Sequence, residues 1–296
     1  MSAVETVPPA RTDQHPLVDV EFAREHLDDP KVRFIEVDVD TSAYDTGHLP
    51  GAVAFNWTSQ LTDQVKRDLV SRQELEALLR SAGVDDDTLI VLYGDNNNWF
   101  AAWAYWQLRY QGIDNVRLLD GGRKKVEASG LPLTTDSPAQ PSGAIQLKGA
   151  PREELRAYRD EVLGAIGQGG RAFVDVRSPE EFRGELAAPA HLPQEAAQRK
   201  GHIPGAANVP WSSAVAEDGT FKPAAELAEL YSTKGLAPEQ EIVAYCRIGE
   251  RSSHTWFVLH ELLGYRRVRN YDGSWTEWGS MVGVPIEKPV PVAAGG

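Results

Sequence analysis

The chain contains a single cysteine, Cys246, among its 296 residues. One thiol excludes an intramolecular disulfide framework and any metal site built from several cysteines. The sequence also lacks an apolar run long enough to span a membrane, and the stretch from Met1 to Pro30 contains no hydrophobic signal segment. We therefore expect a cytoplasmic protein whose cysteine stays reduced.

Positive charge is scarce as well. The chain has 30 Lys and Arg against 43 Asp and Glu, which gives a net charge of −13. This balance argues against nucleic acid or an anionic membrane as the main partner, because either needs a basic face. The sequence shows no phosphate-binding loop, dinucleotide fingerprint or metal-ligand cluster, so we expect neither a cofactor nor a metal.

Strand and helix patterns alternate along the chain after a polar arm at residues 1–16. Apolar runs of strand length are Val32–Val37, Leu89–Tyr93, Val116–Leu119 and Ile242–Tyr245, and helical spacing is found over Val18–Leu27, Ser71–Ser81, Trp99–Tyr110 and Ser252–Leu263. Ser71 and Glu74 form the pattern of a capping box. This alternation predicts an α/β fold of parallel βαβ units in open sheets flanked by helices.

The second half of the chain repeats the first. Gly47–Ala52 (GHLPGA) is matched by Gly201–Ala206 (GHIPGA), 154 residues later, and Gly112–Gly121 by Gly264–Gly273, 152 residues later. A single long spacing indicates a duplicated domain rather than a short-period repeat. We expect a first domain at 17–133, a linker rich in Pro, Ser and Gly at 134–150, and a second domain at 151–290.

The two copies differ where chemistry is expected. At a spacing of 152, Cys246 corresponds to Gly94, and Arg251 to Trp99. The second copy therefore carries a thiol and nearby positive charge, whereas the first is predicted to be a catalytically inactive scaffold. The second copy also contains an insertion over 184–200, which is either a solvated loop or a lid over the site.

Cys246 begins a tight loop between a strand and a helix, CRIGER. Loop N–H groups, the start of the helix and two arginines would all stabilise a thiolate there. The alternative, a cysteine that only fills the core, does not account for Arg247 and Arg251 on either side of Gly249. Cysteine-dependent phosphatases have five residues between Cys and Arg and enclose a phosphate. The four residues here form a shorter loop, which favours sulfur transfer.

These features resemble two-domain rhodaneses, which are thiosulfate sulfurtransferases. The residues that carry the resemblance are the duplicated domain, the two GH[LI]PGA loops, the segment DVRSPEEF at 175–182 and Cys246 in its loop; CRIGERSSHTWF and NYDGSWTEWGS are most similar to the actinobacterial branch. The resemblance implies an inactive first domain, an active site between the domains and a catalytic persulfide at Cys246. Thiosulfate would load the cysteine and release sulfite, and cyanide or a thiol would accept the sulfur. A small thiol protein is a further candidate acceptor.

The chain departs from many animal relatives at two positions. They have a lysine where this chain has Ile248 and an arginine where it has Glu181; the nearest substitutes are Arg183 and Arg199. We expect the substrate to contact the loop and one of these arginines, and aromatic residues to form the pocket wall. The substrate-binding candidates are Arg247, Ile248, Gly249, Glu250, Arg251 and Arg183, and the wall candidates are Trp275, Trp99 and Phe100.

Several other polar residues are expected to be structural. We expect Asp175 and Arg177 to form an ion pair, His48 and His202 to be structural because both copies have one, and Ser252–Ser253 to cap the helix. For Trp275, core packing is about as plausible as a place in the pocket wall. Two alternative functions remain open: a mercaptopyruvate sulfurtransferase, for which Arg247 is less suitable than a small neutral residue, and a non-catalytic persulfide carrier.

Overall fold

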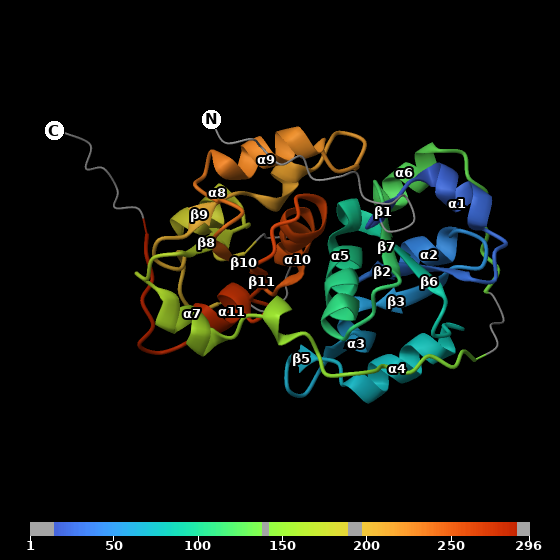
Figure 1. Ribbon diagram of the computed structural model, residues 1–296, viewed down its shortest axis with the longest axis horizontal. Coiled ribbons are helices and arrows are strands. Elements are labelled where there is room, and N and C mark those ends of the chain that lie inside the picture. The colour runs from blue at the N-terminus through green and yellow to red at the C-terminus, as the bar shows by residue number, and fades with distance from the viewer. Residues whose placement is uncertain (1–14, 138–141, 189–196, 289–296) are drawn as a thin grey trace.

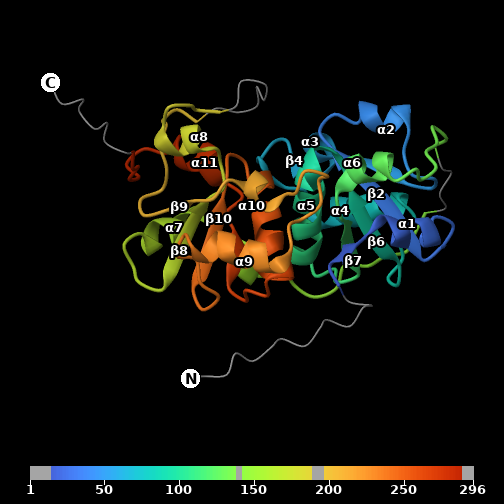
Figure 2. The same ribbon diagram turned by 90° about the horizontal axis from the view of Figure 1, so that it is seen from above.

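The computed structural model describes residues 15–137, 142–188 and 197–288. It contains two parallel sheets that lie side by side along the long axis of the molecule (Figures 1 and 2). The first sheet has the strand order β1-β7-β6-β2-β3, and the second has the order β11-β10-β8-β9. The predicted pair of open, parallel α/β sheets is therefore confirmed.

The first sheet uses residues up to Leu119. Its elements and those around it are β1 (Leu17–Val18), α1 (Val20–His26), β2 (Val32–Asp38), α2 (Ser42–Thr46), β3 (Val53–Asn56), α3 (Trp57–Gln60), β4 (Thr62–Asp63), β5 (Asp68–Leu69), α4 (Arg72–Ser81), β6 (Leu89–Tyr93), α5 (Asp95–Tyr110), β7 (Val116–Leu119) and α6 (Gly122–Ala128). The capping box at Ser71 and Glu74 is present at the start of α4. β4 and β5 form a small antiparallel hairpin outside the sheet.

The second sheet follows the same order of parts. Its elements are η1 (Glu153–Leu155), α7 (Arg159–Ala165), β8 (Arg171–Asp175), α8 (Pro179–Arg183), β9 (Ala207–Asn208), η2 (Trp211–Ala214), α9 (Ala224–Ser232), β10 (Glu241–Tyr245), α10 (Glu250–Trp256), η3 (Phe257–Leu262), β11 (Val268–Asn270) and α11 (Ser274–Trp278). The helix expected over 252–263 divides into α10 and a π-helical turn, η3.

The equivalent helices α5 and α10 pack against each other where the two sheets meet (Figures 1 and 2). Tyr105 of α5 and Phe257 make an edge-to-face contact, with ring centroids 4.8 Å apart. Both side chains are buried, and aromatic pairs of this kind add stabilisation beyond the area they bury. The helix after the cysteine loop is therefore supported by its counterpart in the other copy.

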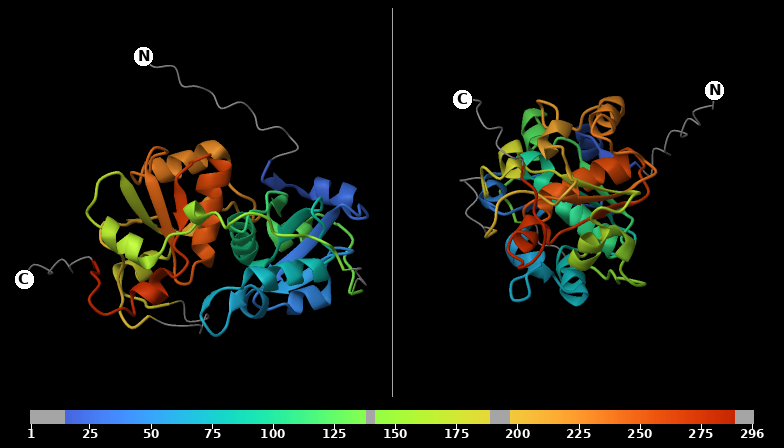
Figure 3. Two further views of the ribbon diagram at one scale, coloured as in Figure 1. Left: turned by 60° about the horizontal axis from the view of Figure 1, so that its bottom comes forward. Right: turned by 90° about the vertical axis from the view of Figure 1, so that its left-hand side faces the viewer.

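The chain between the two sheets is extended and follows the first one (Figure 3, left). Gly143 and Ile145 donate backbone hydrogen bonds to Arg80 and Val84, and Arg152 donates to Tyr110. Residues 138–141 of the expected linker lie outside the described residues, as does the middle of the 184–200 insertion. Among the described residues, no helix combines the length and apolar character that a membrane span requires.

Candidate active site

The loop that begins at Cys246 links the end of β10 to the start of α10. Its backbone is fixed from the β11–α11 side: the N–H of Cys246 donates to Ser274 Oγ over 3.0 Å, and Trp275 donates its N–H to the Cys246 carbonyl. Ser274 adopts a left-handed backbone conformation with φ of 52°, which is uncommon for a residue with a side chain. This conformation places its hydroxyl under the loop.

Gly249 shapes the cradle around the sulfur. Its N–H donates to Cys246 Sγ at 3.1 Å, and its φ is 98°. A Cβ atom here would lie 2.6 Å from the Trp103 ring and 2.7 Å from Asp272 Cα, so only glycine fits. Its carbonyl accepts hydrogen bonds from Ser253 and Asn270.

The Cys246 thiol is completely buried and lies beside a carboxylate. Sγ donates to Glu250 Oε2 across 3.3 Å. Burial first, and then the negative charge of Glu250, raise the pKa of the Cys246 thiol; Arg251 and hydrogen bonds from Ser252 act in the opposite direction. Burial and Glu250 thus oppose the stabilisation of a thiolate that the loop N–H groups and the arginines were predicted to give.

Arg251 is held in a buried ion pair. Its guanidinium donates to both oxygens of Glu181, at 2.9 and 3.1 Å, and it lies over the Trp99 ring of the other domain at 5.6 Å. Burial lowers the pKa of Arg251, but Glu181, Cys246 and Glu250 together outweigh burial and raise it. Glu181, one of the two departures from the family pattern described above, is therefore the ion-pair partner of Arg251.

The other predicted site residues lie in different surroundings. Arg247 is buried in the loop, where Thr276 donates to its carbonyl, and Phe100 stacks on Trp99 inside the first domain. Trp275 is a core residue: it packs under Arg177 at 4.6 Å, so core packing was the correct alternative for it. Arg183 is partly exposed and pairs with Glu185 and Glu180.

The residues that we expected to be structural take part in a buried ion pair and in ring stacking. Asp175 and Arg177 form a fully buried ion pair at 2.6 Å. His48 and His202 stack on Tyr44 and Phe182 in the same way, with ring centroids 3.6 Å apart in both cases.

The two serines at the start of α10 differ from the expectation. The hydroxyls of Ser252 and Ser253 donate to the Gly249 carbonyl. They therefore hold the loop and do not cap helix N–H groups.

The corresponding loop of the first copy is closed. A Cβ atom on Gly94 would overlap the Val37 carbonyl oxygen. The N–H of Asp95 already donates to the Asp38 carboxylate at 2.8 Å, and the N–H of Gly94 donates to Asn98. Burial raises the pKa of Asp38 to about 8. The cradle of this copy is thus filled by its own side chains.

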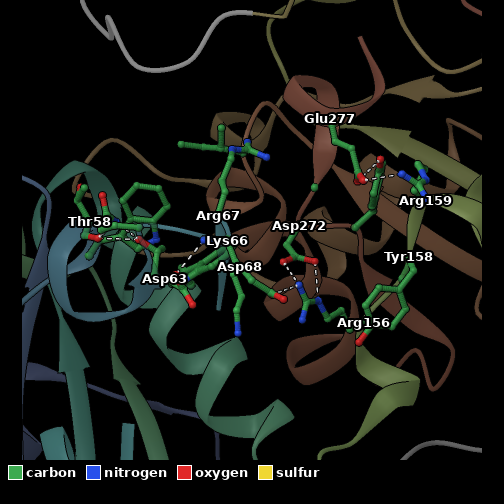
Figure 4. A pocket seen from close by; sticks show the side chains of 18 of the residues that line it. Thr58, Asp63, Lys66, Arg67, Asp68, Arg156, Tyr158, Arg159, Asp272 and Glu277 are labelled. Carbon is green, nitrogen blue, oxygen red and sulfur yellow. Dashed lines mark hydrogen bonds and ion pairs between the residues drawn. The ribbon is translucent and has the colours of Figure 1, made fainter. Parts of the chain in front are cut away.

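A cavity of about 770 Å³ lies between the two domains. The first domain contributes Trp57, Trp103 and the β4–β5 hairpin, and the second contributes residues 156–160, 271–273 and Glu277. Ile248 is the residue of the cysteine loop that lines it. Figure 4 shows Arg156 between Asp272 and Asp68. Arg156 donates to these carboxylates at 2.8 and 2.6 Å, and its ion pair with Asp68 connects the second domain to the first.

The sequence analysis selected neither the β4–β5 hairpin nor Trp103 for the site. Trp103 follows Trp99 by one helical turn on α5, and this spacing is a signal that could have identified it. The hairpin consists of two-residue strands, which no periodicity can reveal.

Comparisons of this chain with family models, related sequences and solved structures agree on its family. The rhodanese-like domain matches residues 19–129 and 158–281. A protein of Mycolicibacterium smegmatis named "Putative thiosulfate sulfurtransferase" is 56% identical over 94% of this chain and 99% of its own length. The sulfur carrier protein TtuD of Thermus thermophilus is 53% identical over 93% and 98%. The solved structure of wild-type EanB matches with a TM-score of 0.81 at 26% identity, over 95% of this chain and 71% of EanB. The chain belongs to the rhodanese-like family and carries two copies of its domain.

Proposed function

We propose that the protein is a thiosulfate sulfurtransferase that carries the transferred sulfur as a persulfide on Cys246. The observation that carries the proposal is the cradle of Cys246, where the Gly249 N–H points at Sγ and Glu250 is in contact with the thiol. Relatives above 50% identity with names of this activity support it. A solved structure of an EanB variant, which has a similar fold at 25% identity, carries a cysteine persulfide together with ergothioneine and is consistent with the proposal.

The first half-reaction begins with the proton of the thiol. It passes from Sγ to Glu250 Oε2, and the resulting thiolate keeps the hydrogen bond from Gly249. The thiolate attacks the outer sulfur of thiosulfate, the S–S bond of the donor breaks, and sulfite leaves with the bonding pair. The terminal sulfur of the persulfide then occupies the mouth of the same cradle until an acceptor attacks it.

Two charged groups are proposed to hold the donor. Arg251 is fixed by Glu181 and Trp99, so its charge is oriented before substrate arrives. Arg247 lies in the loop itself and carries a second positive charge near the cysteine. Two guanidinium groups favour the dianion thiosulfate over the monocarboxylate mercaptopyruvate.

The test combines mass and kinetics. The mass of the intact protein should rise by one sulfur atom, about 32 Da, after treatment with thiosulfate, as persulfide chemistry on a single thiol requires. Cys246→Ser should neither gain this mass nor turn over, while Asp95→Asn in the inactive copy serves as the matched control and should keep both. An unchanged mass in the wild type, or turnover by Cys246→Ser, refutes the proposal. A higher kcat/KM with thiosulfate than with mercaptopyruvate is the expected donor preference.

A second candidate is a persulfide carrier without turnover on small molecules. The relative named sulfur carrier protein TtuD favours it. The two functions differ in one measurement: a carrier accepts one sulfur per chain and stops, whereas the enzyme releases sulfite continuously when thiosulfate and cyanide are both supplied.

A further inference from the structure

Asn270 carries a completely buried amide beside the cysteine loop. It is the last residue of β11 and pairs in register with Ala244, two positions before the cysteine on the chain. Its Oδ1 accepts from the Ser252 hydroxyl at 2.6 Å, and its Nδ2 donates to Ser253 Oγ at 2.9 Å and to the Gly249 carbonyl at 3.2 Å. A buried amide is costly unless its donors and its acceptor are used. Here they are used by the end of the cysteine loop and the start of α10.

The Gly249 carbonyl belongs to the peptide that links Gly249 to Glu250. A peptide unit is planar, so a fixed carbonyl also fixes the position from which the next residue starts. Gly249 has no side chain to limit the rotation of this peptide, and neighbouring groups must limit it instead. Ser252 and Ser253 also donate to the carbonyl, but they belong to the helix that continues the loop. Asn270 lies on a strand and therefore anchors the peptide to the sheet.

We propose that Asn270 is a positioning residue: by anchoring this peptide it holds the Glu250 carboxylate in contact with Cys246 Sγ. The two groups are 3.3 Å apart, and both side chains are completely buried. A rotation of the peptide would weaken the contact, because hydrogen bonds depend steeply on distance and direction. The inference rests on the proposed function, in which this carboxylate takes the proton of the thiol before sulfur is transferred. Asn270 acts on that step through Glu250.

A substitution of Asn270 leaves the charges around the sulfur unchanged. These charges come from the loop, from α8, from α10 and from the turn after β11, and they are Arg247, Glu181, Glu250, Arg251 and Asp272 with its partner Arg156. The helix α5 of the first domain packs on the same loop with Trp103, which is uncharged. Asn270→Leu removes the amide and keeps a side chain of similar size. A change in the ionisation of the thiol therefore reports the position of Glu250 and not the loss of a charge.

The direction of the change follows from the charge of Glu250, which is one of the causes that raise the pKa of the Cys246 thiol. When Asn270→Leu lets the carboxylate move away, the thiolate fraction at a given pH below the thiol pKa should rise about two- to fivefold. This change is smaller than that of removing the charge in Glu250→Gln, because a Coulomb interaction falls only with the reciprocal of distance. The ultraviolet absorbance of the thiolate measures the fraction, with Cys246→Ser as the blank. The pH dependence of persulfide formation from thiosulfate should shift in the same direction.

Three further variants separate positioning from a general structural role. In a protein that already carries Glu250→Gln, Asn270→Leu should have no further effect on the titration, because no charge remains to be positioned. Gln107→Leu is the matched control: Gln107 has a completely buried amide in the first domain and donates to the Leu61 carbonyl. Its replacement should lower the melting temperature without moving the titration curve. Asn270→Ala, whose side chain is too small to clash, repeats the test if Asn270→Leu does not fold.

Two results overturn the proposal. One is a titration curve that stays in place or moves to higher pH in a folded Asn270 variant. The other is a shift of equal size with and without the Glu250 carboxylate, because Asn270 would then act independently of it. The titration needs no sulfur donor. A wild-type protein that gains no sulfur from thiosulfate therefore refutes the proposed function alone.

Discussion

Replacement of Glu250 by glutamine tests how the cysteine is controlled. The substitution keeps the size of a fully buried side chain and removes the negative charge whose oxygen is 3.3 Å from Sγ. Because that charge is one of the causes that raise the pKa of the Cys246 thiol, the variant should ionise at lower pH than the wild type.

The size of the effect follows from Coulomb's law. Two unit charges 4 Å apart interact by about 4 kcal/mol at an effective dielectric constant of 20, which is an upper limit here. Arg251 lies 3.9 Å from the other Glu250 oxygen and compensates part of the charge. A net effect of about 1–2 kcal/mol corresponds to a roughly tenfold larger thiolate fraction at a given pH below the thiol pKa.

The ultraviolet absorbance of the thiolate measures this fraction without a reagent that must enter the buried site. Cys246→Ser provides the blank, and Glu226→Gln on the exposed face of α9 provides a control with the same change in net charge. The titration curve of Glu250→Gln should move to lower pH, and that of the control should not move. A curve that stays in place or moves to higher pH would show that Glu250 does not hold the thiol in its neutral form.

Three further changes test other parts of the molecule. Arg251→Ala should lower the free energy of unfolding by about 3–5 kcal/mol in chemical denaturation, because it leaves Glu181 as a buried, unpaired charge. The double variant Arg251→Ala/Glu181→Ala should be more stable than Arg251→Ala alone, and equal or lower stability of the double variant would contradict this explanation. Gly94→Ala should lower the melting temperature because its Cβ would overlap the Val37 carbonyl, and a melting temperature equal to that of the wild type would contradict the closed loop. Asp38 has a pKa of about 8 when folded against 3.8 as its ordinary value, so its neutral form stabilises the fold below that range and the stability is lost as pH rises from about 4 to 8. Asp38→Asn should flatten this slope in denaturant titrations at several pH values, and an unchanged slope would assign it to other groups.

The fold was predictable because its signals are local or repeated. The strand Leu89–Tyr93 is found as expected, and the pair of GH[LI]PGA loops revealed the duplication directly. The position of Cys246 between β10 and α10 followed from the same patterns. A strand-length apolar run and a capping box determine structure over a few residues, so one sequence is enough to read them.

The electrostatics of the site were not predictable in the same way. Glu181 and Arg251 are 70 positions apart and meet only in the folded chain. The pKa of the Cys246 thiol is raised because burial and the charge of Glu250 outweigh Arg251 and the hydrogen bonds from Ser252, and burial is a property of the whole structure. The β4–β5 hairpin lines the cavity because the two domains pack against each other. This packing, like the burial of the thiol, cannot be read from local sequence patterns.

The closed loop of the first copy also restricts how the protein can evolve. A mutation of Gly94 to cysteine would bring its Cβ atom within 2.4 Å of the Val37 carbonyl oxygen, in a loop whose amides donate to Asp38 and Asn98. Asn96, Asn97 and Asn98 follow with left-handed φ values of 51°, 55° and 64°, whereas in the loop from Cys246 to Arg251 the residue with a positive φ is Gly249. A loop like that of Cys246 would therefore require changes both at Gly94 and in the backbone that follows it, so a single substitution does not create one in the first copy.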